Sequence, residues 1–146
     1  MRYLAIITSL LLASMPGSRA ATPQIEGAWV LSDKWTGLMG VALVIKSNDF
    51  KYWFYSDVKG LGEPKYPITG NVEFNGDAIR LRSTQDARFY DSVWHVVSFK
   101  GEVCLLADKD MQTFRDTRKL PDDRLLYKLE TFDEKKPVLN RPRKRV

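Results

Sequence analysis

Apolar and polar residues alternate along much of this chain with a period of two, which is the pattern of β-strands that have one buried face. Ile79 and Leu81 lie on one side of such a segment, and charged residues lie on the other. Eight segments show β-type patterning, at residues 27–33, 40–47, 49–57, 70–74, 78–83, 92–99, 102–108 and 124–130. The pattern therefore predicts an all-β protein of about eight strands.

Tight turns connect several of these segments. Asn75 and Gly76 form the strongest short signal for a β-hairpin, because both central residues of such a turn need positive φ, and Lys100 with Gly101 is a second two-residue turn. The charged stretch 109–123 has room for one or two turns of helix. We expect an antiparallel up-and-down meander closed into a small barrel, because closure removes exposed strand edges. A β-sandwich is the alternative.

The segment 49–57 is apolar on both faces. Tyr52 and Phe54 share one side of the expected strand, and Trp53 and Tyr55 share the other. Both faces must therefore be covered, by side chains throughout or partly by a ligand. An eight-stranded barrel has an interior just wide enough for side chains or for one small ligand.

The two ends of the chain differ from its body. Residues 1–20 have a basic start, an apolar run and small residues before a cleavage point at Ala21, which is the organisation of a secretory signal peptide. We expect export to the periplasm or the medium, with no transmembrane segment after cleavage. Residues 21–132 would form a single barrel domain. Residues 133–146 are basic, contain two prolines and lack apolar periodicity, which predicts a disordered tail.

The net charge of +5 is concentrated in these ends. The leader carries +2 and the residues from 133 onward carry +4, so the body carries −1. Nucleic-acid binding needs a basic face on the fold, and this distribution argues against it. The tail could instead attract a protein partner or an anionic polymer of the cell envelope.

Residues that could support catalysis are few. Cys104 is the single cysteine and cannot form an intramolecular disulfide, and its apolar surroundings predict a buried thiol. His95 is the single histidine, and no H-x-x-x-H, C-x-x-C or G-x-S-x-G pattern accompanies it. We expect no catalytic residue, no metal and no cofactor.

The aromatic residues are the remaining candidates for a site. We expect Trp53, Tyr55 and Trp94 to line a ligand-binding cavity, with Arg80 or Arg82 as a positive end for an anionic ligand. The alternative is that the rings are plain core, because each buries a large apolar area.

Gly27, Ala28 and Trp29 open the first expected strand with a G-x-W motif. In this motif and in the number and order of its strands, the chain resembles the lipocalins and related calycin barrels. The resemblance implies a cup for a small apolar molecule. It also implies that the tryptophan closes one end of the barrel beneath a basic side chain, for which Arg124 or Lys128 is the candidate.

Together these features predict an exported, non-catalytic protein that binds a small apolar or amphipathic molecule in the cell envelope. The alternative is a protein-interaction module or an inhibitor of an external enzyme, which would use the glycine- and proline-rich stretch 58–67 and the basic tail. An enzyme that depends on His95 is the third possibility.

Overall fold

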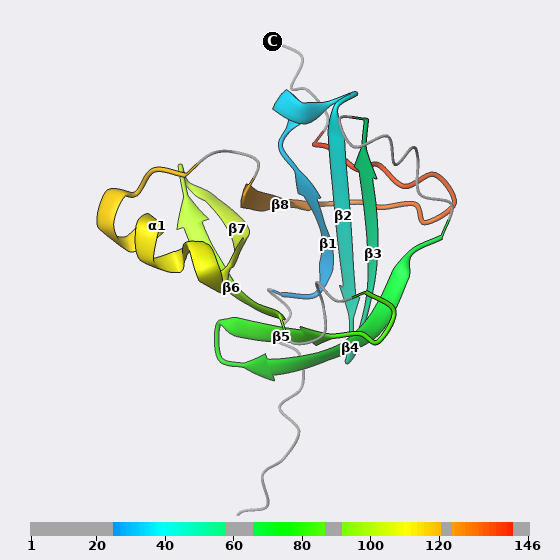
Figure 1. Ribbon diagram of the computed structural model, residues 1–146, viewed down its shortest axis with the longest axis horizontal. Coiled ribbons are helices and arrows are strands. Elements are labelled where there is room, and N and C mark those ends of the chain that lie inside the picture. The colour runs from blue at the N-terminus through cyan, green and yellow to red at the C-terminus, as the bar shows by residue number, and fades with distance from the viewer. Residues whose placement is uncertain (1–24, 58–65, 87–91, 121–123, 142–146) are drawn as a thin grey trace, which may run out of the picture.

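The computed structural model describes residues 25–57, 66–86, 92–120 and 124–141. Eight antiparallel strands, each paired with the next, form a closed barrel, which confirms the predicted meander (Figure 1). The strands are β1 (Gly27–Leu31), β2 (Met39–Lys46), β3 (Asp49–Ser56), β4 (Ile68–Asn75), β5 (Ala78–Arg82), β6 (Ser92–Phe99), β7 (Glu102–Ala107) and β8 (Leu125–Leu129). The pairing of β1 with β8 closes the sheet, so the architecture is a barrel and not a sandwich. The expected leader, residues 1–20, lies outside the described residues.

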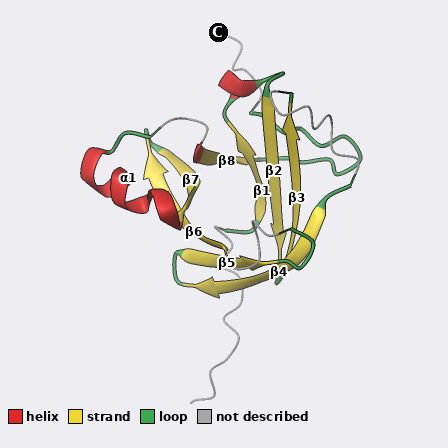
Figure 2. Cartoon of the chain, viewed as in Figure 1, coloured by secondary structure: helices red, strands yellow, loops and turns green. Residues whose placement is uncertain are grey.

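Helical structure is short and lies outside the barrel (Figure 2). Two 3-10 turns occupy Asp33–Trp35 (η1) and Asp108–Asp110 (η3), and one α-helix, α1, spans Met111–Thr117. The predicted turns of helix within 109–123 are therefore confirmed. Among the described residues, no helix is long and apolar enough to cross a membrane.

Side chains from all eight strands point into the barrel. Cross-strand partners share a face of the sheet, and Trp29, Leu43 and Tyr52 form one such row across β1, β2 and β3. All three side chains are buried. The inner cluster consists of Ile25, Trp29, Leu31, Val41, Leu43, Ile45, Phe50, Tyr52, Val72, Ile79, Leu81, Leu105 and Leu126.

Other parts of the chain cover the outer surface of the barrel in two places. Helix α1 inserts Phe114 against the outer face of β6, β7 and β8, where it packs with Val97, Phe99, Cys104, Leu106, Leu125 and Tyr127. Residues 131–141, here called the C-terminal segment, cover the outer face of β1, β2 and β3. Phe132 and Leu139 of this segment pack on Val30, Ala42 and Trp53. On β3, Tyr52 and Trp53 point to opposite faces of the sheet, and both side chains are buried.

The C-terminal segment differs from the expected disordered tail, which was placed at 133–146. The Val41 N–H donates to the Leu139 carbonyl at 2.8 Å, and the Arg141 N–H donates to the Leu31 carbonyl at 2.7 Å. Asn140 adds hydrogen bonds from its side-chain amide to the Met39 and Ser32 carbonyls. Residues up to Arg141 therefore belong to the fold, and residues 142–146 lie outside the described part of the chain.

Gly40 makes this attachment possible. A Cβ atom at position 40 would lie 2.6 Å from the Leu139 Cβ, which is closer than two carbon atoms approach without a shift. The absence of a side chain on β2 lets the backbone of the C-terminal segment lie directly against the strand. At its end, the Arg141 guanidinium forms an ion pair with Glu102 and stacks over the Tyr127 ring, 4.7 Å from its centroid.

Candidate ligand-binding site

Several inward-facing side chains are only partly buried, among them Phe54, Ile68, Val96 and the two rings of one cross-strand row. Phe74, Ile79 and Trp94 are cross-strand partners on β4, β5 and β6 and point into the barrel. Ile79 is 1% exposed, whereas the two rings that flank it are half-buried. The Trp94 indole N–H donates to the Ser92 hydroxyl at 3.3 Å. These rings pack against the inner cluster and still present surface to solvent.

The structure separates Trp94 from the other two aromatic residues predicted to line a site. Trp53 lies on the outer face of β3, 3% exposed, with its ring centroid 5.5 Å from that of Phe132. Tyr55 is half-buried on the same outer face and its hydroxyl donates to the Gly37 carbonyl at 3.4 Å. Trp94 faces the interior from β6, so the three rings do not form one cavity wall.

The two predicted arginines also lie outside the barrel. Arg80 and Arg82 alternate on β5 with the inward-facing Ile79 and Leu81, and both are exposed. Arg82 lies 3.5 Å from the Glu73 carboxylate of β4. Neither can therefore provide the charged end of a site inside the barrel from this position.

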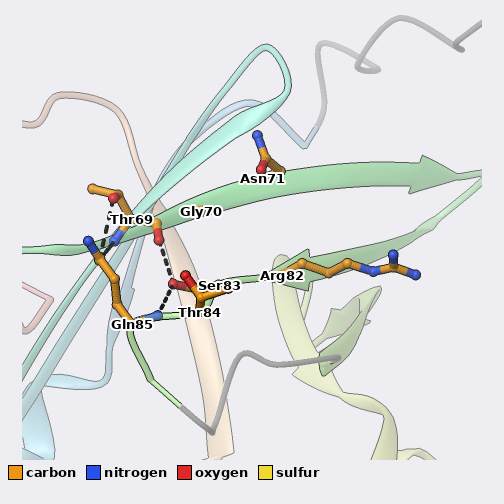
Figure 3. Close-up of a pocket in the computed structure, with 7 residues that line it drawn as sticks. All are labelled: Thr69, Gly70, Asn71, Arg82, Ser83, Thr84 and Gln85. Carbon is orange, nitrogen blue, oxygen red and sulfur yellow. Dashed lines mark hydrogen bonds between the residues drawn. The ribbon is translucent and has the colours of Figure 1, made fainter.

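Arg82 instead borders a polar surface pocket of about 590 Å³ between the start of β4 and the end of β5 (Figure 3). Hydrogen bonds fix its walls. The Ser83 hydroxyl donates to the Thr69 carbonyl at 2.6 Å, and the Thr69 N–H donates to the Gln85 side-chain carbonyl at 2.7 Å. Thr84, Gly70 and Asn71 complete the lining. The polar run Ser83-Thr84-Gln85 after β5 was the sequence signal for this pocket, and alternation alone did not single it out.

The side chains that line this pocket are polar. Its side chains offer amide and hydroxyl groups, with Arg82 as the single charged lining residue among those described. Gly70 at its base has no room for a side chain, because a Cβ there would lie 2.1 Å from the Arg82 carbonyl oxygen. The pocket therefore lies where the backbone of Arg82 and the ring of Phe50 leave no room for a side chain on β4.

The G-x-W residues occupy one end of the barrel. Trp29 is fully buried, and its indole N–H donates to the Ile25 carbonyl at 2.9 Å. The Lys128 ammonium lies 5.4 Å from the centroid of the Trp29 ring. Arg124, the other candidate partner, instead pairs with the buried Asp110 at 2.8 Å. A basic side chain thus lies over the tryptophan, and it is Lys128.

Neighbouring residues contact both side chains that could support catalysis, the Cys104 thiol and the His95 imidazole. Burial raises the pKa of the Cys104 thiol to about 12, and the Glu102 carboxylate adds to the rise while Arg141 opposes it, so the thiol is protonated at neutral pH. His95 is 18% exposed at its side chain and contacts the Asp108 carboxylate through Nε2 at 2.7 Å. Within the described ranges, no group of three or more His, Cys, Asp or Glu residues is arranged to hold a metal ion.

Over the residues that the structure describes, the fold is a closed, eight-stranded, up-and-down antiparallel β-barrel with one short α-helix. Comparison with protein-family models, with curated proteins and with solved structures finds no match to this chain. Function must therefore be argued from the surfaces described above.

Proposed function

We propose that this chain is an exported, non-catalytic, lipocalin-like barrel that binds a small apolar or amphipathic molecule in the cell envelope. The observation that carries the proposal is the row Phe74–Ile79–Trp94. Its two rings point inward from the sheet and remain half-buried, whereas the row Trp29–Leu43–Tyr52 is closed to solvent. Inward-facing aromatic surface that protein atoms leave uncovered is where a small apolar ligand gains most by displacing water.

The lipocalin-like assignment is supported by the arrangement around the G-x-W motif. Trp29 is fully buried, and the Lys128 ammonium lies over its ring, which is the kind of pair that the resemblance leads us to expect. Gly27 has a φ of +123°, and a Cβ there would approach the Lys128 side chain within 3.3 Å. Glycine at this position therefore permits both the backbone conformation and the stacked lysine. Export is supported by the leader-like residues 1–20.

A neutral fluorescent probe tests the proposal. Nile red should bind the wild-type protein, and Trp94→Leu should weaken its binding because one ring of the site is lost. Trp53→Leu is the matched control, since Trp53 lies on the outer face beneath Phe132. The control should lower stability without changing probe affinity. Equal probe affinity in wild type and Trp94→Leu would contradict a site at this row.

A further inference from the structure

A groove on the outer surface lies between the β6–β7 turn and the end of helix α1. It has a volume of about 330 Å³ and is lined by Ser98, Phe99, Lys100, Phe114, Arg118, Lys119 and Leu120. Phe99 and Phe114 are buried and meet edge to face, with their centroids 6.1 Å apart. The two rings therefore form the floor of the groove. The charged side chains that line it are all basic.

Two of the basic side chains are stacked on the two floor rings. The Lys100 ammonium lies 5.0 Å from the centroid of Phe99, and the Arg118 guanidinium carbon lies 5.0 Å from the centroid of Phe114. Each cation is held by the attraction between its charge and the ring face. The two cations thus occupy defined positions over an apolar surface.

These cations have no carboxylate partner in the described part of the chain. Lys100, Arg118 and the neighbouring Lys119 form no ion pair with any described Asp or Glu. Asp122 and Asp123 follow in the sequence and lie outside the described residues. Three positive charges at one groove without such a partner favour an external anion.

The backbone at both stacked cations is in a conformation that favours glycine. Among the described residues other than glycine, Ser47, Lys100 and Arg118 are the ones with positive φ, and Lys100 and Arg118 have values of 50° and 51°. Asparagine or glycine is preferred at the turn position of Lys100, and glycine is preferred at the helix end where Arg118 lies. A basic side chain occupies each position at a cost in backbone conformation, and both side chains border the same groove.

The end of helix α1 does not by itself explain this arrangement. Cations near a helix C-terminus can satisfy its last carbonyl groups. Here the Phe114 carbonyl accepts from the Arg118 backbone N–H at 2.9 Å, and the Thr113 carbonyl accepts from the Thr117 hydroxyl at 2.8 Å. Lys100 belongs to the β-hairpin and not to the helix. What Lys100 and Arg118 have in common is that both side chains line the groove.

We propose that this groove binds a single-chain amphiphile with a phosphate or carboxylate head. The head would lie between Lys100 and Arg118, where charge-assisted hydrogen bonds are strong. The apolar chain would lie along the floor toward Leu120. This site is separate from the row that contains Trp94, because Phe99 faces outward from β6 and Trp94 faces inward. It does not rest on the function proposed above.

Isothermal titration with dodecyl phosphate tests the site. Arg118→Gly and Lys100→Asn should each weaken binding about tenfold, the effect expected when one charge-assisted hydrogen bond is lost. Both substitutions place a preferred residue at a left-handed position, and this gain should roughly offset the lost cation–ring contact, so the melting temperature should stay nearly unchanged. Arg115→Gln, an exposed residue on the same helix, is the matched charge control and should leave the affinity unchanged.

Two further ligands separate the contributions of head and chain. Dodecyl maltoside, which has a neutral head, and inorganic phosphate, which has no chain, should both bind at least about tenfold more weakly. Equal binding of either one, or unchanged affinity in Arg118→Gly and Lys100→Asn, would overturn the proposal. In a chain that carries Trp94→Leu, Arg118→Gly should still weaken the binding of dodecyl phosphate by the same factor. The proposal for the groove and the proposal for the barrel site can therefore be refuted independently.

Discussion

Gly40→Ala should displace the C-terminal segment and destabilise the fold. The added Cβ would lie 2.6 Å from the Leu139 Cβ and 3.1 Å from the Asn140 side-chain oxygen. Carbon atoms pack at about 3.5–4.0 Å, so the segment must move by roughly 1 Å. Hydrogen bonds of 2.8 Å from the Val41 N–H to Leu139 and from Asn140 to the Met39 carbonyl resist that movement. Overpacking of this kind costs about 1–3 kcal/mol.

The effect depends on the presence of Leu139, which provides a control. In a chain that ends at Glu130, the added methyl group no longer meets the C-terminal segment. Replacing a strand glycine by alanine should then stabilise by roughly 0.5–1 kcal/mol. The coupling between Gly40→Ala and truncation should therefore be roughly 1.5–4 kcal/mol, the difference between the two effects.

Urea unfolding of the four proteins, followed by circular dichroism, measures this coupling. Wild type, Gly40→Ala, the truncated chain and the truncated Gly40→Ala chain give the four free energies of unfolding. Truncation alone should also shift tryptophan emission to longer wavelength, because Trp53 loses its contact with Phe132. If Gly40→Ala destabilised the full and truncated chains equally, the reasoning about the C-terminal segment would be refuted.

Three further predictions concern the barrel itself. Gly70→Ala should cost at least about 3 kcal/mol in urea unfolding, because its Cβ would lie 2.1 Å from the Arg82 carbonyl oxygen; a milder effect would contradict the close approach of β4 and β5. Lys128→Gln should cost about 0.5–1 kcal/mol by loss of the cation over Trp29, and Lys128→Arg should restore it. Burial raises the pKa of Cys104 to about 12, above its unfolded value, so the thiol's contribution to stability is complete below about pH 8.5 and is lost as pH rises toward 12. Between these values wild type should lose stability faster than Cys104→Ala by about 1.4 kcal/mol per pH unit, and parallel pH profiles would contradict this.

The strands and their order could be predicted because their signals are local. Alternation fixes which residues share a face, and the turn at Asn75 and Gly76 needs only two residues to be recognised. Closure into a barrel followed from the need to remove strand edges. Alternation does not say which of two apolar faces points inward. Trp53 was therefore placed in a ligand site, whereas the structure places it beneath the C-terminal segment.

The C-terminal segment could not be predicted because it has no periodic signal. It contacts the barrel through isolated residues, chiefly Phe132, Leu139 and Asn140, in a sequence rich in charged residues. The one local hint was Gly40 within an otherwise bulky strand, since a glycine there often marks a close approach of another backbone. The basic groove was missed because positive φ at Lys100 and Arg118 is a property of the folded backbone.

Native mass spectrometry of the mature protein, purified gently from its own host, tests the central claim most directly. A barrel with uncovered inward-facing rings at Phe74 and Trp94 should carry a small molecule through purification. The account predicts a mass above that of the polypeptide, with the excess lost on denaturation. A bare polypeptide mass, unchanged after incubation with a lipid extract of the host envelope, would contradict it.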